Sequence, residues 1–241
     1  MRRETQNVLL VLLGGALLKI SFTGVYLRYV RPQHQWLLIL AGAVMLALAA
    51  VSIVREVRGH RLAGHDHAEG HDHPARSAWL LVLPVLAVFL IAPPALGSES
   101  VERAAAAPRR LTTTAADGME QFPPLPAAKV VPLQLSEFAE RAAWDSGHSL
   151  DGRAVKLTGF VVHEGRNSYV ARIAIACCAA DAYPVKVKLL DSDLSRYADD
   201  RWIETVVELR PGTATKANDY IPSATVRTIR PVGQPTDPYE H

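Results

Sequence analysis

Residues 169–190 read YVARIAIACCAADAYPVKVKLL and predict two neighbouring strands of a sheet. Apolar and polar residues alternate on both sides of a short link, with the period of a half-buried strand. The link holds both cysteines of the chain, Cys177 and Cys178, side by side. Adjacent cysteines can close a disulfide only as a strained ring, which disfavours a structural disulfide. The remaining roles for the two thiols are metal ligation, redox chemistry and burial in the core.

The C-terminal part of the chain carries five such alternating runs, separated by turn residues. They are residues 154–163, 169–177, 183–190, 202–209 and 224–229. An amphipathic helix over Leu135–Trp144 precedes them, with Ser136 as its expected N-cap and its apolar stripe expected in the core. An antiparallel meander of this size, with Gly159 where a strand could coil, predicts a small all-β domain. We expect a five-stranded barrel of the oligonucleotide/oligosaccharide-binding (OB) class, with a small β-sandwich as the alternative.

The N-terminal part predicts an α-helical membrane anchor of two or three transmembrane helices. Val8–Tyr26 and Trp36–Val54 are each about as long as a bilayer core requires, and they follow one another closely, as in a helical hairpin. A third apolar stretch, Trp79–Leu96, contains prolines, which membrane helices tolerate. The density of arginines after the second stretch favours an inside N-terminus. We therefore expect a multi-pass protein in the lipid bilayer of the cell membrane. If the third stretch crosses, as we favour, the C-terminal domain is extracytoplasmic, and if it does not, that domain is cytoplasmic.

A loop rich in histidine and aspartate separates the second and third apolar stretches. It reads GHRLAGHDHAEGHDHP and repeats a His-Asp-His unit, with histidines at His65, His67, His71 and His73. Imidazole and carboxylate are ligands that Zn²⁺ and other divalent transition metals accept, so the loop is a candidate metal-binding segment. The alternative is a solvated polar linker.

These features divide the chain into five parts. They are a transmembrane hairpin at 1–57, the His/Asp-rich loop at 58–77, the third apolar segment at 78–97, a linker rich in Ala, Pro and Thr at 98–132, and the soluble OB-like domain with its leading helix at 133–241.

Two function classes find no support in the composition of the C-terminal domain. Basic and acidic residues are equal in number from Leu150 to His241, and the strand runs lack a row of aromatics, so we expect no nucleic-acid binding. There is no Gly-rich phosphate loop and no His-Glu-x-x-His motif, so we expect no catalytic set.

The link between the central strands is the best candidate site of this domain. Thiolates of Cys177 and Cys178, together with Asp181, could hold Zn²⁺ or a similar divalent ion. Successive strand residues point to opposite faces, so both thiols can face one ion only if the strand ends or bulges there. The alternative is that one cysteine lies in the core while Asp181 caps the turn. Thiol redox activity lacks the Cys-x-x-Cys spacing.

Four short segments carry a resemblance to a known family: Lys156-Leu-Thr-Gly-Phe-Val161, Val170-Ala-Arg172, Cys177-Cys-Ala-Ala-Asp-Ala182 and Asp219-Tyr-Ile-Pro222. With the paired spans and the His loop, the chain resembles the YcgQ-like family of two-component permease subunits. The resemblance implies an accessory subunit beside a larger multi-span permease, with a link to metal ions. A membrane-tethered thiol enzyme using the two cysteines and a structural protein-binding module are the alternatives.

Overall fold

The computed structural model describes residues 3–62, 86, 90, 94–106 and 122–241, and two compact units divide the chain. The first unit is Met1–Pro94 and the second is Ala95–His241. The four predicted histidine ligands at 65, 67, 71 and 73 lie outside the described residues, as does most of the third apolar stretch.

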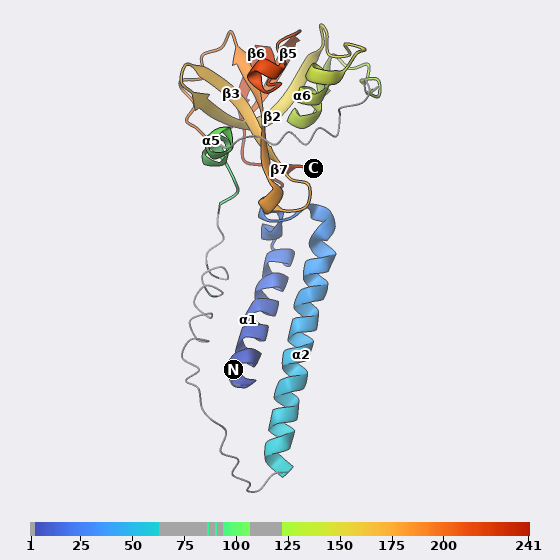
Figure 1. Ribbon diagram of the computed structural model, residues 1–241, viewed down its shortest axis with the longest axis vertical. Helices are drawn as coiled ribbons and strands as arrows, with labels where there is room; N and C mark the ends of the chain where they lie inside the picture. Colours follow the sequence, from blue (N-terminus) through green and yellow to red (C-terminus); the bar gives the residue numbers. More distant parts are fainter. Residues whose placement is uncertain (1–2, 63–85, 87–89, 91–93, 107–121) are drawn as a thin grey trace. The chain divides into compact units, whose positions relative to one another are not determined.

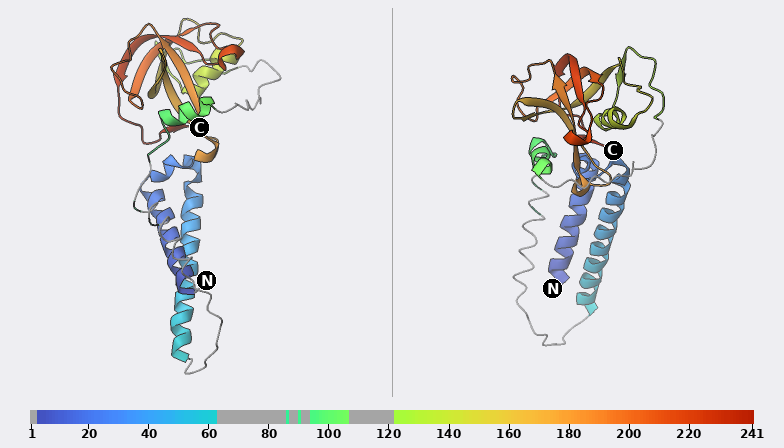
Figure 2. Two further views of the ribbon diagram at one scale, coloured as in Figure 1. Left: turned by 60° about the vertical axis from the view of Figure 1, so that its left-hand side comes forward. Right: turned by 45° about the horizontal axis from the view of Figure 1, so that its top comes forward.

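Two helices make up the described part of the first unit. Helix α1 is Arg3–Phe22 and α2 is Gln35–Leu62, with the short 3-10 turns η1 (Val25–Arg28) and η2 (Pro32–His34) between them. The helices lie side by side in all views (Figure 1, Figure 2). A Cβ on Gly14 would lie 2.9 Å from the carbonyl oxygen of Gly42, so the absence of side chains here allows close approach of the two backbones.

One segment of the described residues, Pro32–Arg58, is long and apolar enough to cross a membrane; it covers η2 and most of α2. Large apolar side chains on it are exposed, as Trp36, Leu40 and Leu48 illustrate. The apolar part of α1, Gln6–Phe22, is a shorter helix. The structure thus gives one candidate membrane-spanning helix near the N-terminus, where the sequence predicts two or three.

The second unit is built on a sheet of seven strands, in the order β1-β2-β5-β6-β4-β3-β7. The strands are β1 (Val130–Pro132), β2 (Ala154–Glu164), β3 (Asn167–Ala174), β4 (Tyr183–Leu190), β5 (Trp202–Arg210), β6 (Ser223–Pro231) and β7 (Tyr239–Glu240). The five predicted strands are confirmed as β2 to β6, and helix α6 has the predicted bounds Leu135–Trp144. The short strands β1 and β7 were not predicted.

The predicted antiparallel meander is wrong in its pairing order. Strand β6 pairs antiparallel with β5 and parallel with β4, so the last long strand inserts between two earlier ones. Strand β2 pairs with both β5 and β3, and the pairings β2–β5–β6–β4–β3–β2 therefore form a closed ring. Alternation of apolar and polar residues marks a strand but does not name its partner, which explains the error.

Apolar side chains pack on both sides of this curved sheet. The larger buried cluster includes Leu157, Val187 and Ile203 from the strands and Leu135 and Phe138 from α6. The second cluster includes Phe160 and Trp202, whose ring centroids lie 5.7 Å apart. Helix α6 therefore covers part of the first core, as the sequence predicts for its apolar stripe.

Helix α5 (Ser98–Ala106) packs on the second cluster, although its residues lie within the predicted linker. Its Val101 is buried, and both the backbone N–H and the hydroxyl of Ser98 donate to the carboxylate of Asp200, at 2.6 and 2.7 Å. An acidic side chain that accepts from the first turn stabilises a helix start. The domain therefore begins before the predicted boundary at residue 133.

Gly159 lies where the backbone of β3 closely approaches that of β2, and the space there excludes a side chain. A Cβ at this position would lie 2.4 Å from the carbonyl oxygen of Ala171. We predict that Gly159→Ala lowers the free energy of unfolding by about 3 kcal/mol, because a backbone atom must move. Urea unfolding of the full chain, followed by tryptophan fluorescence, measures the change. Gly233→Ala is the control, since nothing lies within 4 Å of its Cβ position; equal stability of the two variants would contradict this prediction.

Candidate functional site

The link between β3 and β4 holds the predicted site residues in a loop. Strand β3 ends at Ala174, three residues earlier than predicted, and the loop continues through η3 (Ala179–Asp181) to Tyr183. Cys177 is exposed and Cys178 is half-buried. Neither thiol lies in the core, whereas the alternative interpretation places one of them there. Because the strand has ended, the two side chains are released from the alternation that would point them to opposite faces.

The Asp181 carboxylate organises this loop. It accepts the backbone N–H of Ala176 and of Cys177, each at 2.8 Å, and lies 3.4 Å from the N–H of Cys178. These hydrogen bonds fold the chain back over the carboxylate, as short acidic side chains do in turns. A hydrogen bond from the Cys177 side chain, aided by the backbone N–H groups, lowers the pKa of Asp181 below its ordinary value. Asp181 is therefore a carboxylate with two thiols beside it.

The three candidate ligands lie close together in space. The Sγ atoms of Cys177 and Cys178 are 3.6 Å apart, and one ligand atom from each of Cys177, Cys178 and Asp181 lies within 4.8 Å of the other two. Among the residues that the structure describes, this is the one such group of three His, Cys, Asp or Glu side chains. His163 lies elsewhere, with its Nδ1 2.8 Å from Asp199, and His148 is not in the group.

The electrostatics of the loop keep the first thiol protonated. The hydrogen bond to Asp181, followed by that to Cys178, raises the pKa of Cys177 to about 12. Since the thiolate is the reactive form of cysteine, Cys177 is a poor nucleophile at neutral pH. The loop lacks the basic neighbour or long helix start that activates redox cysteines, which disfavours the thiol-enzyme alternative.

The C-terminus of the chain fixes the base of the loop. Strand β7 runs parallel to the end of β3, and the N–H of Ile175 donates to the carbonyl oxygen of Glu240 at 3.0 Å. The Glu240 carboxylate accepts the N–H of Leu135 at 2.7 Å and of Ser136 at 2.8 Å, the first residues of α6. The Glu240 carboxylate thus caps the helix, where the sequence predicts the side chain of Ser136. The residues around Ser136 in the sequence do not indicate that a residue so far along the chain provides the cap.

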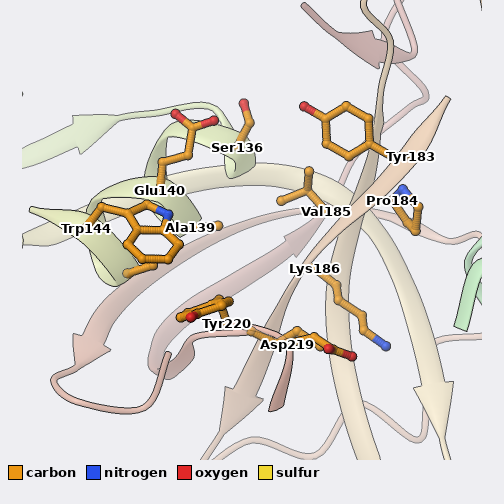
Figure 3. Close-up of a pocket in the computed structure, with 12 residues that line it drawn as sticks. Ser136, Ala139, Glu140, Trp144, Tyr183, Pro184, Val185, Lys186, Asp219 and Tyr220 are labelled. Atoms are coloured by element: carbon orange, nitrogen blue, oxygen red, sulfur yellow. The ribbon is translucent and has the colours of Figure 1, made fainter. Parts of the chain in front are cut away.

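A pocket that the sequence does not predict lies between α6, the start of β4 and the loop before β6. Figure 3 shows Trp144 and Glu140 on the helix, Tyr183 on the strand, and Asp219 and Tyr220 on the loop, all around one space. The only sequence signal for it is the Asp-Tyr-Ile-Pro segment, which carries no recognisable chemistry by itself. The sequence predicts that the apolar stripe of the helix is buried in the core, so it does not predict that Trp144 is 37% exposed and lines a pocket.

Comparison with known families matches most of the chain. The model of the DUF1980 N-terminal domain matches residues 5–106, and that of the DUF1980 C-terminal domain matches residues 145–241. No curated protein matches, and no solved structure matches.

The role of Asp181 in setting the thiol pKa can be tested by alkylation. We predict that Asp181→Asn, in a Cys178→Ser background, speeds alkylation of Cys177 by iodoacetamide at pH 8 about tenfold or more. Removing the carboxylate removes the hydrogen bond and the negative charge that disfavour the thiolate, so the pKa of Cys177 falls towards its ordinary 9.0. Asp193→Asn is the control, because this exposed carboxylate makes a similar turn contact with the N–H of Ser195. An unchanged rate in Asp181→Asn would show that the carboxylate does not control the thiol.

Proposed function

The chain belongs to the DUF1980 family, and we propose that its C-terminal domain captures a thiophilic divalent metal ion, such as Zn²⁺, for delivery to a membrane permease. The observation that carries this proposal is the gathering of two thiols and a carboxylate, with their ligand atoms within 4.8 Å of one another, on an exposed loop. Thiolate and carboxylate together suit Zn²⁺ and its neighbours.

The spacing of the sulfur atoms supports a shared ion. Two thiolates bound tetrahedrally to Zn²⁺ at about 2.3 Å have their sulfurs about 3.8 Å apart. The Sγ atoms of Cys177 and Cys178 are already 3.6 Å apart, so little movement of the backbone is needed. With Asp181 as a third ligand, a fourth position stays open to water or to a ligand from another molecule. A site with three protein ligands suits exchange better than a closed site with four.

The same carboxylate that holds the proton on Cys177 favours its replacement by a cation. Without metal, the site holds two neutral thiols and the negative carboxylate of Asp181. A divalent ion that displaces both thiol protons is bound by three anionic ligands. Binding therefore releases protons, and the affinity rises with pH. The site would take up metal where the ion is plentiful and release it where protons compete more strongly.

The membrane setting completes the proposal. The candidate span in α2 supports a membrane anchor. In our proposal the anchor is multi-pass, the closed strand ring is an OB-like barrel on the extracytoplasmic side, and the chain is the accessory subunit of a multi-span permease. The histidines at 65, 67, 71 and 73 supply weaker ligands on the loop that follows α2.

Zinc titration of the full chain in detergent micelles tests the proposed site. The measurements use a background in which His65, His67, His71 and His73 are alanine, so that the loop cannot bind. We predict one ion per chain, release of about two protons per ion, and loss of affinity by at least about tenfold in Cys177→Ser and in Cys178→Ser, because each removes a thiolate ligand. Calorimetry in buffers of different ionisation enthalpy measures both quantities.

Asp193→Asn is the matched control for Asp181→Asn, and only the latter should weaken binding. Unchanged affinity in both cysteine variants would refute the site. Binding that is seen only with the histidines restored would assign metal handling to the loop, and no binding in either form would exclude zinc capture by this chain.

A further inference from the structure

The pocket beside α6 is a second place where this domain can bind a ligand, and it uses none of the proposed metal ligands. Its volume is about 240 Å³, and α6, the start of β4 and the loop after η4 (Lys216–Asn218) form its walls. This is below the range of about 300–1,000 Å³ that is usual for drug-sized ligands. A compound of few heavy atoms therefore fits it best.

Aromatic rings form much of the pocket wall. The ring centroids of Trp144 and Tyr220 lie 4.6 Å apart with the planes tilted by 42°. Tyr183 faces the same space and is 51% exposed (Figure 3). None of these three described residues belongs to either buried cluster of the domain. Their packing is thus not needed to fill the core, and the ring surface that the Trp144–Tyr220 contact leaves uncovered is available to a ligand.

The backbone is strained where it presents Tyr220. Asp219 and Tyr220 have φ angles of 54° and 57°, so two successive residues other than glycine adopt the left-handed conformation. For a bulky residue such as tyrosine this conformation is unfavourable and persists only where its surroundings impose it. The Asn218 amide imposes it by donating to the carbonyl oxygens of Thr213 at 2.7 Å and Ile221 at 3.0 Å. Strain of this kind is typical of ligand-binding positions.

The charges of the lining favour a cation. Two carboxylates, Glu140 and Asp219, line the pocket together with one ammonium group, that of Lys186. The Lys186 ammonium is 2.5 Å from Glu164 and 4.8 Å from the ring centroid of Tyr169, neither of which lines the pocket. By formal charge, the lining therefore carries two negative groups and one positive group.

We infer that this pocket binds a small organic cation, with an alkylammonium or guanidinium group held against the rings of Trp144, Tyr183 and Tyr220. The negative face of an aromatic ring attracts such cations, and tryptophan does so most strongly. The carboxylates of Glu140 and Asp219 add charge complementarity. The cation is a free small molecule, which the limited volume of the pocket favours.

Fluorine NMR of the full chain, in micelles and in a phosphate buffer free of organic cations, tests this inference. The four tryptophans are labelled as 5-fluorotryptophan, and the Trp144 resonance is assigned from Trp144→Phe. Choline is the probe, methylguanidinium is a second cation, and 3,3-dimethylbutan-1-ol is the uncharged isostere of choline. We expect choline to shift the Trp144 resonance saturably, with an affinity at least about fivefold above that of the isostere.

Variants separate the contributions of the rings and the charge. Glu140→Gln should weaken choline binding about threefold or more, whereas Glu99→Gln, on the exposed surface of α5, should not. Tyr220→Leu should weaken it about fivefold or more and Tyr220→Phe much less, because the ring face provides the attraction. Trp36→Leu removes an exposed tryptophan outside the pocket and should have no effect.

Equal affinity for choline and its isostere would overturn the inference, because the pocket would then be merely apolar. The absence of any shift at Trp144 with either cation would overturn it as well. The outcome is independent of the proposed metal site, since Cys177→Ser should leave choline binding unchanged while it weakens zinc binding.

Discussion

The arrangement of the C-terminal domain depends on one buried carboxylate, that of Glu240. Only 2% of this residue is exposed, and its two oxygens accept the first backbone N–H groups of α6. A buried carboxylate is stable only when such donors replace water, and a helix start needs acceptors for its free N–H groups. The carbonyl oxygen of the same residue accepts the N–H of Ile175, two residues before Cys177. One residue of the C-terminal strand thus fixes the helix beside the pocket and the base of the cysteine loop together.

This dependence explains what could be predicted from the sequence and what could not. The long strands and α6 follow from local periodicity, and the Cys177–Asp181 cluster follows from residue type and short spacing. The group that caps the first N–H groups of α6 is the carboxylate of Glu240, more than a hundred residues away in the chain, whereas local sequence predicts Ser136. Strands β1 and β7 are three and two residues long, too short for any periodic signal. The parallel pairing of β4 with β6 and the pocket both arise from tertiary contacts, which no single segment encodes.

Asp181 carries two opposing effects on the proposed metal site. Its hydrogen bonds to the backbone hold the loop so that the two Sγ atoms are 3.6 Å apart, which lowers the entropic cost of bringing the ligands to one ion. The hydrogen bond that it accepts from Cys177 also raises the pKa of that thiol, which makes protons stronger competitors for the sulfur. A preorganised site with a high thiol pKa binds less tightly than one with ionised thiols but exchanges its ion more readily. That combination suits delivery to a partner better than permanent storage.

The proposed metal site and the pocket beside α6 adjoin along the chain, since Tyr183 follows Asp181 by two residues, and carboxylates belong to both. A shared field of one sign attracts cations in general but cannot choose among them. Selection must come from the groups at short range. Thiolates and a carboxylate favour a compact ion that forms coordinate bonds, whereas ring faces favour a large, weakly hydrated cation that cannot. An alkylammonium group does not fit the proposed metal site, because it has no empty orbital to accept electrons from sulfur. A hydrated divalent ion does not fit the pocket, because its contact with aromatic rings is too weak to replace its bound water. Two sites of opposite chemistry can therefore share one electrostatic environment without competing for the same ligand.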